Sequence, residues 1–341
     1  LAILTQKIFE QNKQYFTKTI FPIVIIILFI IPLTMPEDNT WLSWADFPPS
    51  ILNGGSSFSN FTSDDWKDAT LWIKQNTPED AVIASWWDYG YWITTLSERT
   101  TLADNATLID WQIKKLAYIL ITIPDNSWSI LSSGYTEDIS PYIGNENILE
   151  FGGELESEFN KNYLEKFGVA CEQIFKADAQ KLGVGEESCN PITKGMDADY
   201  LLIYLAGERF YIENFNVPLY TLEGGGDESK KTWFTKISNH QISKYIENDN
   251  ITPTKFYMEN TTLGMLTPFT IYKYVEPGTG RTFDKYQNGL IPVYINDLKF
   301  NDVENDPFYL VYASPSFYSQ EQGPISTVLI YKINHDYNPQ N

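Results

Sequence analysis

The longest apolar run of the chain lies near its N-terminus. Residues 16–35 read FTKTIFPIVIIILFIIPLTM, and the part from Ile20 to Leu33 holds no charged residue. A run of this length is typical of a helix that crosses a bilayer, where prolines such as Pro22 and Pro32 are tolerated. We therefore expect one transmembrane helix within residues 1–36. The alternative is a signal peptide, but the stretch before the run is long and no A-x-A cleavage site follows.

The charges beside this run predict its orientation. Lys7, Lys13 and Lys18 precede the uncharged part from Ile20 to Leu33, whereas Glu37 and Asp38 follow it. By the positive-inside rule, the first residues face the cytoplasm and the rest of the chain is extracytoplasmic. Because the chain begins with Leu rather than Met, we expect it to be the end of a longer protein with further spans.

Residues 37–62 are rich in Pro, Gly and Ser, which predicts an external linker or loop. A helix is then expected after Ser63, because Trp66, Ala69 and Ile73 recur on one face of a 3.6-residue period. The short apolar run AVIAS, residues 81–85, predicts a buried strand, and a helical pattern resumes after Gly90. The intervening aromatic residues therefore lie on a strand-to-helix turn.

The remaining pattern predicts a mixed fold. Helical segments are followed by a strand, and the last third consists of short apolar or alternating runs separated by Gly, Pro, Asn and Asp. The fold class expected is α+β: one N-terminal transmembrane helix, a mixed α/β globular core, and a β-rich C-terminal part. The ranges are 109–120 and 154–181 for the helices, 198–206 for the strand, 63–252 for the core domain and 253–341 for the β-rich domain.

The composition narrows the possible partners. The chain has 44 acidic and 24 basic residues and a net charge of -20, which argues against nucleic-acid binding and favours an acidic, solvated surface. Cys171 and Cys189 have no His nearby that would complete a zinc site. One disulfide and two free thiols are both compatible with this spacing, and an external location favours the disulfide.

The turn ASWWDYGYWI, residues 84–93, combines several aromatic rings with one carboxylate. An indole N–H only donates and an ionised carboxylate only accepts, so Trp86, Trp87 and Asp88 together offer what a hydroxyl group requires. Aromatic walls would exclude water and pack against a neighbouring methyl group. The alternative interpretation is a structural one, in which the rings fill the core and Asp88 caps the next helix.

The segment WWDYG, Trp86 to Gly90, resembles the signature of the catalytic subunits of oligosaccharyltransferases. Its flanks, LWIKQNTPEDAVIAS before it and RTTLADNAT after it, are also similar to that family. The resemblance implies that Trp86, Trp87 and Asp88 bind the hydroxyl of the Ser or Thr two residues after the acceptor Asn. Tyr89 and Gly90 complete the motif.

A second segment, GGGDESKKTWFTKI, resembles the Asp-x-x-Lys-x-x-x-(Met/Ile) motif of archaeal and eukaryotic members. Asp227 and Lys230 match, but Phe234 stands where the family has Met or Ile. The spacing i, i+3, i+7 places the three on one helical face. The resemblance implies acceptor-binding roles for Lys230 and Phe234, with Asp227 in support. The alternative makes Asp227 an N-cap, Lys230 a solvated residue and Phe234 a core residue.

The resemblance implies a glycosyltransferase that moves a glycan from a dolichyl phosphate carrier to Asn in Asn-x-Ser/Thr sequons of acceptor polypeptides. It also implies a membrane location, a lipid-linked oligosaccharide as donor, and Mn²⁺ or Mg²⁺ as the metal. The family's metal ligands and catalytic carboxylates precede the region present here, so we expect no catalytic residue in this chain and no activity of this chain alone. The competing class is a membrane-anchored extracellular carbohydrate-binding or glycosidase domain, which would bind free glycan instead of acceptor peptide.

Four Asn-x-Ser/Thr sequons follow the apolar run, at Asn60, Asn105, Asn250 and Asn260. Asn105 lies beside the WWDYG segment, and we expect its role to be structural. At least one of the other three is expected to carry a glycan in the native host.

Overall fold

The computed structural model describes the chain in several ranges. They are residues 15–34, 49–58, 61–106, 110–143, 194–212, 215 and 217–339. The predicted helix 154–181, both cysteines (Cys171 and Cys189) and the sequon at Asn60 lie outside the described residues.

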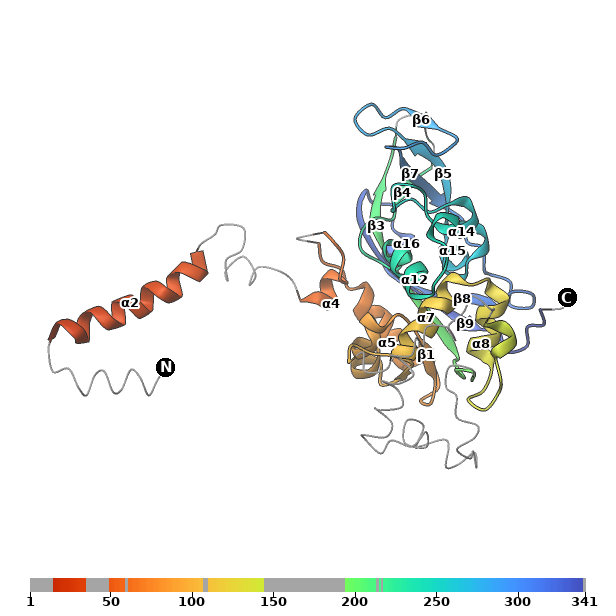
Figure 1. Ribbon diagram of the computed structural model, residues 1–341, viewed down its shortest axis with the longest axis horizontal. Helices are drawn as coiled ribbons and strands as arrows, with labels where there is room; N and C mark the ends of the chain where they lie inside the picture. Colours follow the sequence, from red (N-terminus) through yellow and green to blue (C-terminus); the bar gives the residue numbers. More distant parts are fainter. Residues whose placement is uncertain are drawn as a thin grey trace.

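Helix α2, Tyr15–Thr34, occupies the region of the predicted transmembrane helix and lies apart from the globular part of the chain (Figure 1). A search of the described residues finds no helix that is both long enough and apolar enough to cross a membrane. The structure therefore does not bear out the predicted span.

A mixed sheet of nine strands forms the centre of the described globular part. Strand β1 runs parallel to β2 and β3, and the other pairings are antiparallel. The strands are β1 Val82–Ala84, β2 Thr100–Thr101, β3 Tyr200–Phe210, β4 Leu219–Thr221, β5 Phe269–Val275, β6 Thr282–Phe283, β7 Ile291–Asn296, β8 Phe308–Ala313 and β9 Gly323–Ile333.

Strand β3 is the axis of this sheet. It pairs with β1 and β4 and, along its whole length from Tyr200↔Lys332 to Arg209↔Gly323, with β9. Eight consecutive residues of β3, from Tyr200 to Gly207, are buried, because neighbouring elements cover it on all sides. The mixed α/β core and the β-rich last third expected from the sequence are both present, and strands from the two regions share one sheet. The domain boundary at residue 252 stays a prediction.

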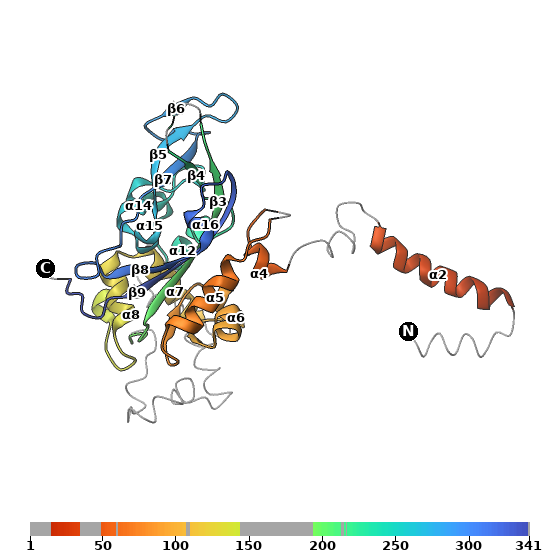
Figure 2. The ribbon, with the colours of Figure 1, turned by 180° about the vertical axis from the view of Figure 1, so that it is seen from behind.

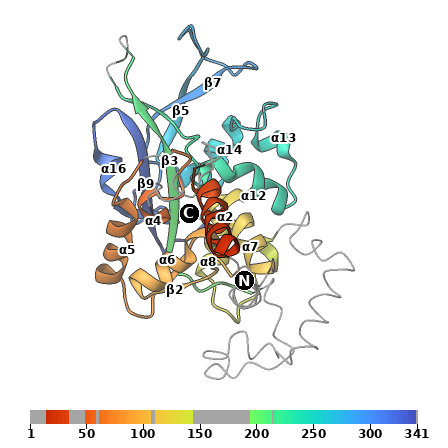
Figure 3. The same cartoon turned by 90° about the vertical axis from the view of Figure 1, so that its left-hand side faces the viewer.

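Helices pack on both faces of β3 and β9. Figure 3 shows α5 on one side and α7, α12 and α14 on the other, and Figure 2 shows α5 beside α6. The helices of this part are α4 Ser50–Asn53, α5 Asp65–Asn76, α6 Gly90–Trp92, α7 Asp110–Ile121, α8 Pro124–Ser132, α12 Lys231–Ile237, α13 Ile242–Tyr245, α14 Lys255–Asn260, α15 Thr262–Leu266 and α16 Pro315–Tyr318. In α5, Trp66, Ala69 and Ile73 are buried, which confirms the predicted apolar face.

Candidate functional site

The WWDYG segment forms a compact turn at the end of β1. Trp86 is extended, Trp87–Tyr89 form a 3₁₀ turn, and α6 begins at Gly90. A Cβ on Gly90 would lie 2.4 Å from the carbonyl oxygen of Ala103 and 2.5 Å from Cα of Asp104. Only glycine therefore allows the turn to pack so closely against the segment that follows β2.

Asn105 joins this segment to the turn. Its Nδ2 donates to the carbonyl oxygen of Asp88 at 3.0 Å, and its Oδ1 accepts from the backbone N–H of Tyr91 at 3.3 Å. The side chain thus fixes the backbone on both sides of Gly90, which agrees with the structural role expected for Asn105.

The second motif reaches the turn from β3 and β4. The backbone N–H of Asp227 donates to the carbonyl oxygen of Tyr204 at 2.6 Å, and a Cβ on Gly226 would lie 2.5 Å from that oxygen. The buried Asp227 carboxylate accepts from Tyr204 N–H at 2.8 Å and from Tyr89 O–H at 2.7 Å. Asp227 occupies the N-cap position of the 3₁₀ turn Glu228–Lys230, as the alternative expected, but its side chain makes no capping hydrogen bond.

Lys230 connects the two motifs. Its Nζ lies 2.5 Å from Oδ2 of Asp88, donates to the Tyr89 hydroxyl oxygen at 3.0 Å, and lies 3.8 Å from Oδ1 of Asp227. It also lies 4.8 Å from the centroid of the Tyr89 ring, within the range of a cation–π contact. The ion pair between Lys230 and Asp88 is partly exposed, with 22% and 29% of the two side chains accessible.

The tryptophans border this ion pair. Trp86 is buried and meets Phe234 edge to face, with ring centroids 4.6 Å apart, and Trp87 is half-buried at 6.1 Å from Trp86. Within the described part of the chain, neither indole N–H donates a hydrogen bond to another residue. Phe234 is fully buried, so in this structure it supports the Trp86 ring from behind. Its direct contact with an acceptor stays a prediction.

Burial governs the protonation of the inner groups. It raises the pKa of Asp227, and Lys230 and the hydrogen bonds from Tyr204 and Tyr89 oppose this rise only in part. Burial, together with the charge of Asp227, raises the pKa of Tyr89 well above its usual range. Tyr89 therefore remains a protonated donor to Asp227, and its oxygen is left to accept from Lys230.

This arrangement can bind a small polar group at Asp88. Lys230 engages one carboxylate oxygen, Oδ2, and no other described side chain pairs with that carboxylate. The remaining oxygen can accept a hydrogen bond from a hydroxyl group, and the neighbouring indoles can donate hydrogen bonds to the hydroxyl oxygen. Among the described residues, no group of three or more His, Cys, Asp or Glu side chains is placed to hold a metal ion.

In the sequence, 136 residues lie between Gly90 and Asp227, yet β1 and β3 bring the two motifs together. The sequence indicated Trp86, Trp87, Asp88, Lys230 and Phe234 as a set, and the structure places all five in one neighbourhood. The sequence did not indicate a role for Tyr204. Its carbonyl oxygen accepts from the Asp227 N–H, and its own N–H donates to the Asp227 carboxylate. Only the pairing of β3 with the rest of the sheet indicates that role.

Part of the chain is similar to known proteins. Residues 78–179 match the family model of the STT3/PglB/AglB core domain. The chain is 38% identical over 97 residues to the dolichyl-diphosphooligosaccharide–protein glycosyltransferase subunit STT3B of Oryza sativa subsp. japonica, covering 28% of this chain and 14% of that protein. It is 33% identical over 91 residues to subunit STT3 of Saccharomyces cerevisiae, covering 27% and 12%.

Two solved structures are also similar to this chain at low levels. The C-terminal globular domain of an oligosaccharyltransferase from Archaeoglobus fulgidus is 14% identical, with a TM-score of 0.26 and coverage of 69% of this chain and 99% of that one. The C-terminal domain of C. jejuni PglB is 12% identical, with a TM-score of 0.29 and coverage of 79% and 99%.

The resemblance to oligosaccharyltransferase catalytic subunits is thus confirmed over a segment that contains Trp86–Gly90 and Asn105. Lys230 and Phe234 lie outside the residues that the family model matches. The matched part spans between 12% and 14% of the length of the rice and yeast relatives.

Proposed function

We propose that this chain is the sequon-recognition part of an oligosaccharyltransferase that transfers a glycan from a dolichyl phosphate carrier to Asn in Asn-x-Ser/Thr. The observation that carries the proposal is the partly exposed Asp88–Lys230 pair beside Trp86 and Trp87, within a segment that matches the STT3/PglB/AglB core domain. The same match gives no support to the competing class, a carbohydrate-binding or glycosidase domain.

In the proposed complex, the Ser or Thr hydroxyl of the sequon donates a hydrogen bond to the Asp88 carboxylate and accepts hydrogen bonds from the indole N–H groups. Lys230 fixes the orientation of the Asp88 carboxylate, and it is itself held by Tyr89, whose hydroxyl donates to Asp227. A threonine methyl would pack on the tryptophan rings, which gives Thr an apolar contact that Ser lacks.

The proposal assigns the chemistry of transfer to residues outside this chain. We propose that the Mn²⁺ or Mg²⁺ ligands and the catalytic carboxylates belong to the rest of the full-length protein, which also binds the lipid-linked oligosaccharide at the membrane. The domain described here would face the extracytoplasmic side and hold the acceptor polypeptide in place.

The test replaces Asp88 in the full-length enzyme. Asp88→Ala removes the acceptor for the hydroxyl proton, which costs about 1–3 kcal/mol of recognition, or roughly ten- to a hundredfold in selectivity. We expect the ratio of transfer to Asn-x-Thr over Asn-x-Ala peptides to fall by that factor, with the melting temperature nearly unchanged. Asp80→Ala, at an exposed position outside the site, is the matched control and should preserve the ratio.

A purely structural role for Asp88 predicts the opposite result. The variant would then melt early and lose activity on all peptides alike, and it would keep its preference for Thr over Ala. That outcome would remove the basis for hydroxyl recognition by Asp88.

A further inference from the structure

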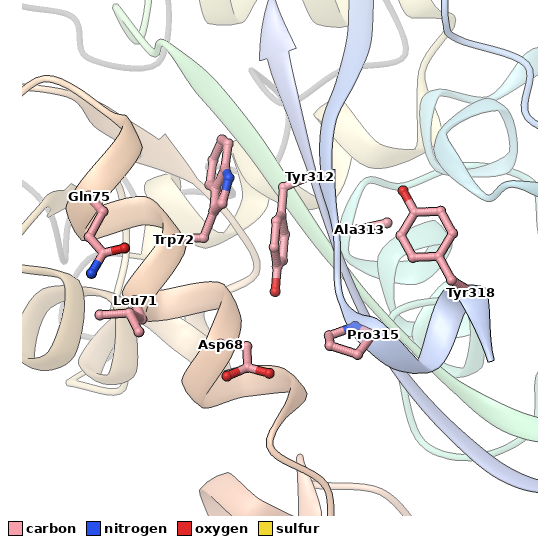
Figure 4. Close-up of a pocket in the computed structure, with 8 residues that line it drawn as sticks. All are labelled: Asp68, Leu71, Trp72, Gln75, Tyr312, Ala313, Pro315 and Tyr318. Atoms are coloured by element: carbon pink, nitrogen blue, oxygen red, sulfur yellow. The ribbon is translucent and has the colours of Figure 1, made fainter.

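A pocket lies between α5 on one side and the end of β8 with α16 on the other (Figure 4). Its volume is about 570 Å³, which is within the usual size of ligand sites. Asp68, Leu71 and Trp72 of α5 contribute to one wall, and Tyr312, Pro315 and Tyr318 contribute to the other. The acceptor site is separate, because Trp66, on the buried face of α5, contacts Tyr89 at 4.7 Å between ring centroids.

Three aromatic rings line this pocket. Trp72 and Tyr312 stack with centroids 5.1 Å apart and an interplanar angle of 29°. Tyr318 stands across Ala313 and Pro315 from them, and 64% of it is exposed (Figure 4). Trp72 and Tyr312 are half-buried and Tyr318 is exposed, so all three rings remain accessible, and the faces of aromatic rings attract cations.

The charge of the pocket has one sign. Asp68 is the only charged residue in its lining. The two lysines of α5 are engaged elsewhere, since Lys67 pairs with Asp64 at 2.8 Å and Lys74 pairs with Glu98. No described cation therefore lies within ion-pair distance of the Asp68 carboxylate.

Tyr312 lies near the negative charge of Asp68. Burial and the carboxylates of Asp68 and Asp65 raise the pKa of Tyr312, because both disfavour a phenolate. Its hydroxyl forms no hydrogen bond with a described residue. The pocket thus combines aromatic faces, an unpaired carboxylate and an available hydroxyl, and it offers no positive group to an anionic ligand.

We propose that this pocket binds an arginine side chain from a basic segment of another protein. A guanidinium group can stack on the aromatic rings while its N–H groups reach the carboxylate of Asp68, a combination that an ammonium group matches less well. The net charge of -20 would attract such a segment from a distance. This docking function goes beyond acceptor recognition and does not depend on it.

The experiment uses the full 341-residue chain and two probes of equal shape, Nα-acetyl-arginine amide and its neutral isostere Nα-acetyl-citrulline amide. NMR follows the indole N–H signal of Trp72, assigned with Trp72→Phe. We expect a saturable shift with the arginine probe, weakened by added salt, and a clearly weaker response to citrulline. Asp68→Asn should raise Kd by about two- to fivefold.

Two further variants test the contributions separately. Asp80→Asn removes one exposed charge outside the pocket and should leave Kd unchanged. Tyr318→Leu keeps an apolar side chain but removes the aromatic face, so the affinity for arginine should fall while the fold is retained. Equal binding of citrulline, a stronger response to a neutral oligosaccharide such as maltotriose, or no saturable shift with arginine would each overturn the proposal.

Discussion

The two carboxylates of the candidate site, Asp88 and Asp227, differ in their exposure to solvent. Asp227 is 1% exposed, and its carboxylate accepts two hydrogen bonds. The side chain of Asp88 is 29% exposed, and it pairs with Lys230, which is also partly exposed to solvent. A buried carboxylate that is fully hydrogen-bonded is rigid, and it can orient Tyr89 and Lys230 without reorganisation. The exposed carboxylate is the one left to meet a ligand.

Glu228, the residue after Asp227, allows a test of how burial changes the pKa of a carboxylate. Its carboxylate lies 2.7 Å from Nζ of Lys231, and both side chains are almost wholly buried. Burial raises the pKa of Glu228 above its ordinary value of 4.5, although Lys231 opposes the change. The folded state therefore binds the proton more tightly than the unfolded state, so this group's contribution to stability is greatest below about pH 4.5 and falls as the pH rises above it.

Glu228→Gln removes this titration while keeping the shape of the side chain. The difference in the free energy of unfolding, wild type minus variant, should decrease from pH 4 upward, by about 1.4 kcal/mol for each unit by which the two states' pKa values differ. Urea unfolding at stepped pH values measures it, with Glu304→Gln at an exposed position as the control for the charge change. A difference that grows with pH would contradict the prediction.

At the scale of elements, the site depends on the turn Trp87–Tyr89 and on the close packing of the following Gly90, where there is no room for a side chain. Gly90 is buried at the start of α6 against the backbone of Ala103 and Asp104, and Asn105 then closes the contact. We expect Gly90→Ala to force these segments apart, at a cost of about 1–3 kcal/mol in the free energy of unfolding. The loss of the Asn105 contact should also displace Asp88.

Gly134→Ala is the matched control for Gly90→Ala. A Cβ on Gly134 would meet no atom within 4 Å, so this variant should unfold close to the wild-type denaturant midpoint. Chemical denaturation of both variants measures the contrast. Equal midpoints for the two variants would show that the turn can shift without cost.

The elements that the sequence predicted best are those whose pattern is local. The apolar face of α5 and the run AVIAS gave a helix and a strand close to their observed bounds, because one period of burial dominates each segment. The run after Gly90 was expected to be helical, and it divides into α6 and a π-helical turn at Ile93–Ser97. The π-helical turn packs against α5, a tertiary contact that the periodicity of the sequence does not indicate.

The site residues also divide into those that the sequence indicated and those whose contacts depend on the fold. Trp86, Trp87 and Asp88 were evident from donor and acceptor chemistry, and the spacing of Lys230 predicted its place beside the motif only through the resemblance. The resemblance implied that Tyr89 and Asp227 support the site, but the hydrogen bond between them could not be predicted, because it depends on the parallel pairing of β1 with β3 across more than a hundred intervening residues. Long-range pairing is the information that a single sequence lacks.

At the scale of the whole molecule, folding changes how the chain presents its own sequons. Asn250 and Asn260 are exposed, but the residues two positions later, Thr252 and Thr262, are buried. The Thr252 hydroxyl donates to Oδ2 of Asp249 at 2.6 Å, and that of Thr262 donates to the carbonyl oxygen of Thr122 at 3.0 Å. An enzyme that reads the sequon hydroxyl would find neither one available in the folded chain.

We therefore expect any glycan at Asn250 or Asn260 to be added before the chain folds. An active oligosaccharyltransferase, supplied with the folded chain, should glycosylate Asn260 at least about tenfold less than it glycosylates an unfolded peptide of residues 255–266, because exposing Thr262 first breaks a buried hydrogen bond and its packing. Mass spectrometry of both substrates measures the occupancy, and the peptide with Thr262→Ala confirms that transfer requires the hydroxyl. Equal transfer to the folded chain and the peptide would show that Thr262 leaves the core readily. It would refute the expectation that burial of Thr262 protects Asn260 from glycosylation.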